Sequence, residues 1–247
     1  MEVLHDLVGF QNLKIFQNTD WFSFSLDSVL LPNFVTLNHN IERVLDLGTG
    51  NAPIPMILSL KTKAKIVAVE IQEDLYQLAK KNIDYNHLRD RIELLHLDMK
   101  KLREIYGPDT FDVITCNPPY FKYQESSHLN DDEHKVIARH EKCITLEDIF
   151  SLCFYLLKNQ GVLGMVHRTD RLIEIIHLAN QYHLEVKRLR LVYPKENTDS
   201  NLVLIEFRKN GRTGLKILPP LYVHHSDGSY TDEVLNMFKE SENNESK

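Results

Sequence analysis

The residues best suited to chemistry follow four short hydrophobic runs of the sequence. Each run ends in glycine or in polar residues, in the order Asp46-Leu47-Gly48-Thr49-Gly50, Glu70, Asp98-Met99 and Asn117-Pro118-Pro119-Tyr120. In an open parallel sheet, ligands bind beyond the carboxyl ends of the strands. If the four runs are neighbouring strands, they predict one ligand site built from four strand ends.

The first of these segments predicts a cofactor loop. Gly48 and Gly50 allow a tight turn and a close approach of a ligand to the backbone. A loop for NAD usually has a third glycine, but Pro53 occupies that position here. The acid Asp46 before the loop and Glu70 at the next strand end suit a cofactor with an amino acid moiety, a ribose diol and no pyrophosphate. S-adenosylmethionine is such a molecule.

Three acids in successive strand-end positions strengthen this interpretation. Glu70 can accept hydrogen bonds from both ribose hydroxyls, and Asp98, followed by Met99, can accept one from the adenine amino group. Any one carboxylate in such a place could instead cap the following helix. The repetition along Asp46, Glu70 and Asp98 favours a ligand.

The segment from Asn117 to Tyr120 predicts the reacting end of the site. Its two prolines fix the backbone and have no amide hydrogen, so the turn offers mainly acceptors: the Asn117 side-chain oxygen and the Pro118 carbonyl. Tyr120 adds a ring for stacking. Two acceptors that hold the hydrogens of a planar amino group favour the pyramidal nitrogen that attacks a methyl group. The alternative for the tetrapeptide alone is an ordinary rigid turn.

Together these motifs resemble the class I S-adenosylmethionine-dependent methyltransferases that methylate amino groups. Three flanking segments look like the bacterial tRNA1(Val) adenine-37 N6-methyltransferase family, namely 24–31 (Phe-Ser-Leu-Asp-Ser-Val-Leu-Leu), 138–141 (Ala-Arg-His-Glu) and 219–223 (Pro-Pro-Leu-Tyr-Val). The resemblance covers nearly the whole chain. It implies S-adenosylmethionine-dependent N6-methylation of an adenine in structured RNA, with tRNA as the partner.

The resemblance also implies roles for single residues. Asp46, Gly48 and Gly50 would line the methionine side of the cofactor, Glu70 its ribose, and Asp98 and Met99 its adenine, while Asp27 would help to cover it. The target base would lie on Asn117, Pro118, Pro119 and Tyr120, with Phe121 as a second aromatic wall. Such a base is either extruded from a helix or presented by a loop.

The surrounding sequence predicts the elements that must position these residues. Strands near 43–47, 66–70, 91–97, 111–116 and 162–166 alternate with helices near 54–61, 73–86, 146–158 and 170–182. Two more strands, 185–192 and 201–207, follow each other directly and permit antiparallel pairing at one edge. The fold class is therefore α/β, a Rossmann-like methyltransferase fold with a seven-stranded, mostly parallel sheet, an antiparallel edge strand and helices on both faces.

Three parts of the chain are predicted. Residues 1–40 form a cofactor-covering extension, with a helix capped by Asp27 and running to Leu37; residues 41–225 form the catalytic domain; residues 226–247 form an acidic C-terminal helix and tail. The polar segment 121–141 is expected to be a mobile lid over the target base.

Charge and composition narrow the partners. Twenty-nine Lys and Arg against thirty-five Asp and Glu give a net charge of −6, yet residues 185–216 hold eight bases and four acids. This local excess, with Lys187, Arg188 and Arg190 joined by Arg139, is the candidate RNA-backbone face; the alternative is a solvated surface of mixed charge. Three cysteines without a Cys-x-x-Cys pair, and the lack of a leader or an apolar span, indicate a cytoplasmic protein with no membrane partner.

Other functions are less consistent with the sequence. The six-residue spacing of His128, His134 and His140 fits no compact ligand pattern, so no metal is expected. A glutamine N5-methyltransferase shares the Asn-Pro-Pro-Tyr turn but usually has a separate helical N-terminal domain. A DNA methyltransferase would need a target-recognition domain, and a non-enzymatic RNA-binding protein would not need the acids and Asn117 together. An NAD-dependent oxidoreductase conflicts with Pro53.

Overall fold

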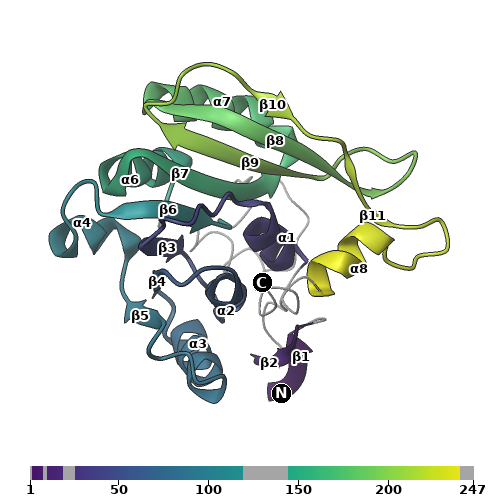
Figure 1. Cartoon of the computed structure of the whole chain (residues 1–247), viewed down its shortest axis with the longest axis horizontal. Coiled ribbons are helices and arrows are strands. Elements are labelled where there is room, and N and C mark those ends of the chain that lie inside the picture. The colour runs from purple at the N-terminus through teal and green to yellow at the C-terminus, as the bar shows by residue number, and fades with distance from the viewer. Residues whose placement is uncertain (1, 8–9, 19–25, 119–143, 240–247) are drawn as a thin grey trace, which may run out of the picture.

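The computed structural model describes residues 2–7, 10–18, 26–118 and 144–239 (Figure 1). Most of these residues form one sheet with helices on both faces. The strands of that sheet are β3 (Arg43–Leu47), β4 (Lys65–Glu70), β5 (Ile92–His96), β6 (Phe111–Cys116), β7 (Leu157–Arg168), β8 (Leu184–Lys195), β9 (Leu202–Lys209), β10 (Lys216–Ile217) and β11 (Leu221–His224).

The strand order confirms the predicted mostly parallel sheet and adds detail to it. The order is β10-β8-β9-β7-β6-β3-β4-β5, and β11 also pairs with β8, which gives nine strands where seven were expected. Strand β9 pairs antiparallel with β7 and with β8, as the adjacency of the last two long strands predicted. The antiparallel strand nevertheless lies inside the sheet, because β9 is inserted between β7 and β8. The short strands β10 and β11 lie parallel to β8 and extend the sheet beyond it.

Alternating residues of the strands serve two separate cores. Val44 and Ile66 belong to the core under α1 (Asp27–Phe34), α2 (Pro53–Lys61) and α3 (Glu73–Tyr85). Leu45 and Val67, their neighbours in sequence, belong to the core under α4 (Leu102–Ile105), α6 (Leu146–Leu156) and α7 (Leu172–Gln181). Strands buried on both faces read as continuous apolar runs, which is why β3 and β4 could be recognised in the sequence.

Smaller elements complete the fold. A hairpin of β1 (Glu2–Leu7) and β2 (Phe10–Asn18) packs against α3, and α8 (Asp232–Lys239) packs against α1. Two 3-10 helices, η1 (Met99–Lys101) and η2 (Thr169–Arg171), precede α4 and α7. Helix α6 begins with a capping box, in which the Thr145 hydroxyl accepts from the Asp148 amide and the Asp148 carboxylate accepts from the Thr145 amide.

The predicted helix cap at Asp27 is wrong in its detail. Leu26 occupies the N-cap position, Asp27 is the first residue of α1, and the helix ends at Phe34 instead of Leu37. An acid in the first turn still favours the helix through its dipole. Pro32 lies inside this helix, where it removes one backbone donor.

Candidate active site

The register of the central strands brings the predicted site residues to one edge of the sheet. Leu47 of β3 lies opposite both Val69 of β4 and Cys116 of β6, and Glu70 lies opposite His96 of β5. The four strands therefore end at the same level of the sheet. The glycine loop, Glu70, the residues after His96 and Asn117 are neighbours at this edge.

The glycine loop has the backbone conformation that the sequence predicted. Gly48 and Gly50 have φ angles of +65° and +59°, in the left-handed region that favours glycine. A Cβ at Gly50 would meet no atom within 4 Å, so this side of the loop is open. The amide of Thr49 donates to the Val69 carbonyl at 2.9 Å and fixes the loop to β4. The loop thus offers room for a ligand against its backbone.

Glu70 is held by three backbone amides. Its Oε2 accepts from Gly50 at 2.8 Å, and its Oε1 accepts from Ile71 and from Gln72, each at 2.9 Å. The residue is only 4% exposed. A carboxylate has about four acceptor positions, so these bonds fix its orientation and leave acceptor capacity for a ligand. Glu70 therefore both ties the glycine loop to β4 and can receive a hydroxyl.

Asp46 is fully buried beside the loop. Its Oδ1 accepts from the Thr115 hydroxyl of β6 at 2.6 Å, and its Oδ2 has no hydrogen-bond partner among the described residues. Burial raises the pKa of the Asp46 carboxyl to about 7, although the Thr115 hydrogen bond acts in the opposite direction. An acceptor buried without a partner is costly unless a bound cation or donor completes it. The cationic amino group of an amino acid moiety would do so.

The end of β5 carries both predicted residues, and the end of β4 carries one residue that the sequence analysis did not identify. Asp98 caps η1 by accepting from the Lys100 amide at 3.0 Å with Oδ1, so the capping interpretation is correct for one of its two oxygens. The Met99 methyl group lies 3.7 Å from the position of a Cβ on Gly48. Ile71, directly after Glu70, is 44% exposed, and an apolar side chain exposed at a ligand edge suits the face of an adenine ring.

The described part of the predicted turn begins where β6 ends. Asn117 is half-buried and Pro118 is buried. Pro119, Tyr120, Phe121 and Arg139 lie outside the described residues, as does the predicted lid 121–141.

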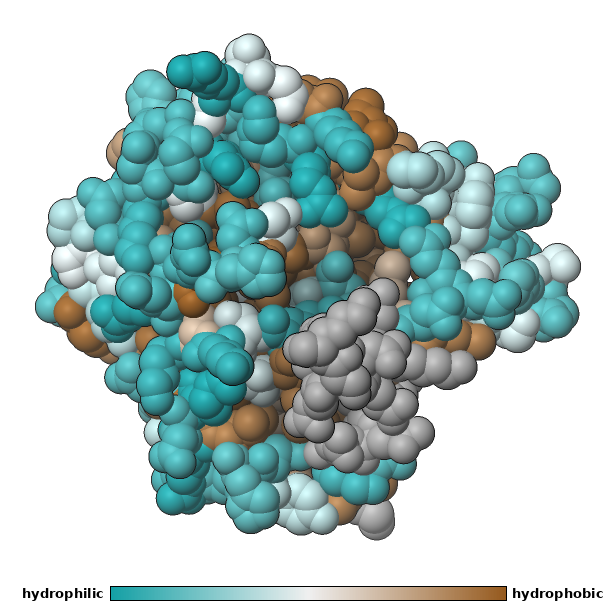
Figure 2. All heavy atoms as spheres, in the orientation of Figure 1, coloured by the Kyte–Doolittle hydropathy of each residue, from teal (hydrophilic) through white to brown (hydrophobic). Residues whose placement is uncertain are grey.

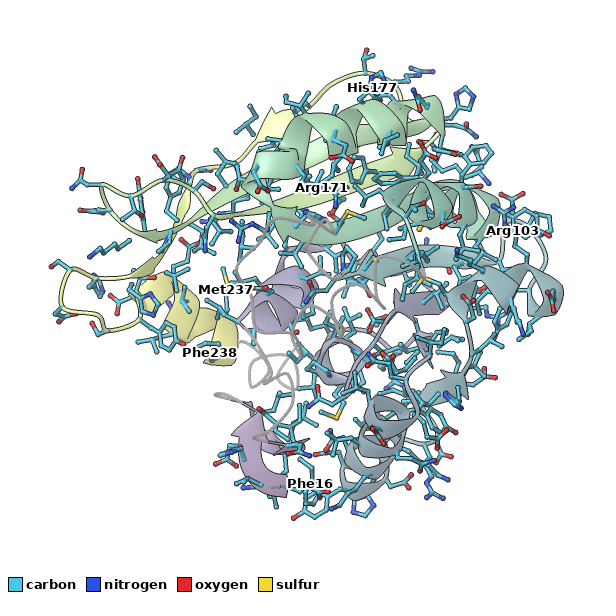
Figure 3. The ribbon with its side chains drawn as sticks, turned by 180° about the vertical axis from the view of Figure 1, so that it is seen from behind. Phe16, Arg103, Arg171, His177, Met237 and Phe238 are labelled. Carbon is cyan, nitrogen blue, oxygen red and sulfur yellow. The ribbon has the colours of Figure 1, made fainter. Side chains whose placement is uncertain are left out.

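The N-terminal hairpin reaches the glycine loop through polar contacts. Asn51 Nδ2 donates to the Phe16 carbonyl at 3.3 Å, and Asn82 of α3 contacts both Asn51 and Phe16. Phe16 lies beside α3 in the rear view (Figure 3). The sequence analysis did not identify Asn82 as part of the site. The sequence feature that could have indicated it is a polar residue on the buried face of an amphipathic helix. The hairpin is thus placed where an extension could cover a bound cofactor.

Of the four basic residues proposed for the RNA backbone, the three that the structure describes have partners within the protein. Arg188 donates to the Phe34 carbonyl, the Thr36 hydroxyl and the carboxylate of Glu206, which is 2% exposed. Arg190 pairs with Glu233 at 2.7 Å and donates to the Pro219 carbonyl, and Lys187 donates to the Arg212 carbonyl. These contacts give Arg188 and Arg190 structural roles, because both hold segments outside the sheet against β8.

The described residues show neither a metal cluster nor a membrane helix. No group of three or more His, Cys, Asp or Glu side chains among them could hold a metal ion. Within the same residues, no helix is long and apolar enough to cross a bilayer. The surface in Figure 2 is mostly hydrophilic, with apolar residues reaching it in scattered places.

Comparison with known proteins relates the chain to methyltransferases. A family model described as "Methyltransferase domain" matches residues 38–217. A tRNA1(Val) (adenine(37)-N6)-methyltransferase of Bacteroides thetaiotaomicron is 31% identical over 84% of this chain and 85% of its own length. A protein of the same name from Flavobacterium psychrophilum is 26% identical over 81% and 91%.

A solved structure agrees with the fold. The structure of a predicted O-methyltransferase from Agrobacterium tumefaciens superposes with a TM-score of 0.69 at 20% identity, covering 87% of this chain and 96% of that one. At this identity the likeness concerns the arrangement of the sheet and helices alone. It is the arrangement that brings the glycine loop, Glu70 and Asn117 to one edge.

Proposed function

The chain belongs to the tRNA1(Val) (adenine(37)-N6)-methyltransferase family of S-adenosylmethionine-dependent enzymes, and we propose that Asn117 and Pro118 hold the target adenine for direct methyl transfer. The observation that carries this assignment is the register of β3 and β6. Leu47 lies opposite Cys116, so Gly48 and Asn117 leave the sheet as neighbours. The methyl donor and the methyl acceptor can therefore meet between two adjacent strand ends.

The residues present fit S-adenosylmethionine, which supplies a methyl group on a positively charged sulfur. Asp46 Oδ2, buried and without a hydrogen-bond partner among the described residues, suits the amino group of the methionine moiety. Glu70 suits the ribose hydroxyls, Asp98 suits the adenine amino group, and Met99 and Ile71 offer apolar contacts. The open side of Gly50 leaves space for the ligand.

The protein's part in the reaction is to orient the adenine amino group. An aromatic amino nitrogen is a weak nucleophile because its lone pair is delocalised into the ring. The side-chain oxygen of Asn117 and the carbonyl of Pro118 are the acceptors for its two hydrogens. Acceptors that bind more strongly as the nitrogen becomes pyramidal and its hydrogens gain positive charge stabilise the transition state over the ground state, and one of these hydrogens passes to water as a proton after the transfer. Tyr120 is proposed to stack on the base.

The parts outside the catalytic domain are proposed to assist. Residues 1–40 cover the cofactor, as the contact of Phe16 with Asn51 supports. Residues 226–247 include α8, which packs on α1 and holds that covering segment in place. The substrate is tRNA, and we place the enzyme in the cytoplasm because that is where a tRNA substrate and reduced cysteines would be found.

The decisive test uses one RNA with and without its target base. Purified protein is incubated with labelled S-adenosylmethionine and a tRNA1(Val) transcript, or the same transcript with guanine at position 37, and nucleosides are identified by mass spectrometry. N6-methyladenosine is expected only with adenine at position 37. Methylation that persists with guanine, or cofactor binding without methylation of any RNA, would overturn the assignment.

Asn117→Ala separates catalysis from binding in the same assay. It should lower kcat by roughly 10²–10³-fold, the usual cost of one transition-state hydrogen bond, while cofactor affinity stays within about twofold. Equal loss of cofactor affinity would instead show that Asn117 shapes the glycine loop.

A further inference from the structure

A cavity lies one strand beyond the target turn. It has a volume of about 380 Å³ and is bordered by Pro118 after β6, His167 near the end of β7 and the first turns of α6 and α7. Cys116 lies opposite Met165 in the register of β6 and β7, which places Pro118 beside His167. The volume is within the range of small-molecule sites, roughly 300–1,000 Å³. The cavity therefore adjoins the methyl-transfer position without being the same space as the glycine loop.

The wall of this cavity combines apolar side chains with polar ones, among them an arginine–glutamate pair. Pro118, Ile149 and Leu178 supply apolar contacts. Arg171 and Glu174 form a bidentate pair, with Nε to Oε2 at 3.0 Å and Nη2 to Oε1 at 2.8 Å. Arg171, at the start of α7, is labelled in Figure 3, and its side chain is only 15% exposed. An arginine and a glutamate that are paired with each other thus lie together at an apolar surface, where the N–H groups of Arg171 outside this pair can still donate.

The charges argue against a phosphate in this cavity. The described residues that line it include one arginine and two glutamates, Glu147 and Glu174. His167 adds no positive charge at neutral pH, because burial and the nearby Arg171 lower its pKa to about 4. Its Nδ1 accepts from the Arg168 amide at 2.8 Å, so the neutral ring carries its proton on Nε2. The wall suits a neutral, planar group with donors and acceptors on its edge.

We propose that this cavity is a second nucleobase subsite, which holds the base next to the methylated adenine. The proposal rests on the proposed function. Arg171 donates to a carbonyl or ring-nitrogen acceptor of that base from an N–H group outside its pair with Glu174. Glu174 accepts from the amino or imino group of the base with a remaining lone pair, and the apolar wall covers the ring. Every base has an acceptor and a donor on its Watson–Crick edge, so the pair favours the base whose acceptor and donor lie in the order in which Arg171 and Glu174 present their groups.

The strand order supports this position. Along the carboxyl edge the order is β5, β4, β3, β6 and β7. The first three ends carry Asp98, Glu70 and the glycine loop, and the fourth carries Asn117. Strand β7, which lies about 5 Å from β6 in the sheet, ends beside the cavity. An RNA strand with its target base on β6 thus has a neighbouring nucleotide within reach of β7.

The test uses short stem-loop RNAs with the target adenine and each of the four bases at either neighbouring position. The variants are Arg171→Gln and Glu174→Gln, and the matched control is Arg103→Gln. Arg103 lies on α4, apart from Arg171 in Figure 3, with its guanidinium over the Tyr155 ring. The measurements are kcat and KM for each RNA and the affinity for S-adenosylhomocysteine.

The wild-type protein and Arg103→Gln are expected to discriminate about tenfold or more between neighbouring bases, since one good bidentate contact contributes ~1–3 kcal/mol. Arg171→Gln and Glu174→Gln should remove most of this preference by raising the KM of the preferred RNA, with S-adenosylhomocysteine affinity unchanged.

Three results would overturn the subsite. The first is a wild-type protein with no preference among the bases next to the target adenine, and the second is a preference that survives in both Arg171→Gln and Glu174→Gln. The third is a fall in kcat at unchanged KM in these variants, which would assign the cavity to the target base itself. A wild-type protein that methylates none of the RNAs would remove the proposed function as well. Normal wild-type methylation with wild-type-like variants would remove only the subsite.

Discussion

The side-chain nitrogen of Asn82 lies 2.8 Å from the carbonyl oxygen of Asn51, so helix α3 directly holds the end of the glycine loop. The same buried amide accepts from the Phe16 backbone at 2.6 Å and donates to the Phe16 carbonyl at 3.2 Å. One side chain therefore joins three segments: the loop, the helix that follows Glu70, and the N-terminal hairpin.

We expect Asn82→Asp to weaken cofactor binding. The substitution preserves shape and the acceptor for Phe16 but removes both donors and brings a carboxylate oxygen against two carbonyls. A buried group left unsatisfied costs about 1–3 kcal/mol, which corresponds to a loss of roughly tenfold in S-adenosylhomocysteine affinity if the loop shifts. Isothermal calorimetry with purified protein measures this change.

Asn86→Asp is the matched control for Asn82→Asp. Asn86 lies one turn further along α3 and pairs with the Lys14 backbone at 2.8 and 2.7 Å, and among the described residues it forms no hydrogen bond with the glycine loop. It should lower the free energy of unfolding and leave cofactor affinity within about twofold. Equal losses of affinity in the two variants would show that the hairpin as a whole, and not the bridge from Asn82 to Asn51, supports the loop.

Glu70→Gln tests the proposed ribose site. A glutamine has one acceptor oxygen in place of two, so at least one of the amides of Gly50, Ile71 and Gln72 loses its partner together with the ligand hydroxyls. Hydrogen bonds to a charged acceptor contribute about 1.5–3 kcal/mol each, so S-adenosylhomocysteine affinity should fall by roughly 10–100-fold.

Glu73→Gln is the control for this prediction, because Glu73 is exposed, lies three residues further on and faces His96 at 3.1 Å. The S-adenosylhomocysteine affinity of Glu73→Gln should match that of the wild-type protein. Unchanged affinity in Glu70→Gln would remove Glu70 from the ribose site and leave it only the structural role of holding the glycine loop.

Asp46 predicts a pH dependence of cofactor binding. Burial raises the pKa of its carboxyl from 3.8 to about 7. If the ionised carboxylate pairs with the cofactor's amino group, affinity should rise up to tenfold per pH unit below pH 7 and level off above it. Asp46→Asn should bind weakly with no such rise, and Thr115→Val, which removes an opposing hydrogen bond, should move the midpoint upward. A flat profile in the wild-type protein would contradict the pairing.

The same group affects stability with the opposite sign. Between pH 4 and 7 the unfolded chain has already released the Asp46 proton while the folded protein keeps it, so this residue lowers the free energy of unfolding as pH rises and adds no further change above pH 7. Urea unfolding across this range should show a smaller decrease in Asp46→Asn than in the wild-type protein.

The strand ends of the site could be predicted because each is encoded locally. A buried run such as 43–47 followed by Gly48 and Gly50 indicates both a strand and a turn, and Asn117 and Pro118 follow a similar run. The insertion of β9 between β7 and β8 could not be predicted, because adjacency in sequence permits antiparallel pairing without fixing which strand is outermost. Short strands such as β10 have too few residues for any periodic pattern.

The side-chain partners of the basic segment could not be predicted for a related reason. In the sequence, Arg188 is one cation in a segment with a basic excess, and nothing local distinguishes it from Lys187. Its partner Glu206 lies opposite it across two antiparallel strands, in a register shifted by an irregularity between Val186 and Arg188. Only the tertiary structure distinguishes a solvated cation from one that forms an ion pair with a buried acid.

Arg188→Ala is therefore expected to destabilise the protein instead of weakening RNA binding directly. The change leaves the carboxylate of Glu206, which is 2% exposed, with only the Thr36 amide at 2.8 Å among its described contacts. Removing one partner of a buried ion pair typically costs about 3–5 kcal/mol. Denaturant unfolding should show a loss of this order, and Glu206→Gln in the Arg188→Ala background should recover part of it because the buried charge is then absent.

Lys187→Ala provides the contrast on the neighbouring residue. Lys187 is partly exposed, and its hydrogen bond to the Arg212 carbonyl lies at the surface, so its loss should change the free energy of unfolding by no more than about 0.5 kcal/mol. If the basic segment contacts the RNA backbone, Lys187→Ala should reduce the slope of log affinity against log salt by about one, whereas Arg188→Ala leaves that slope unchanged. A reduced salt-dependence slope together with an unchanged free energy of unfolding in Arg188→Ala would instead indicate that Arg188 contacts the RNA backbone. A residue that neutralises a phosphate must be able to separate from its protein partner with little loss of stability.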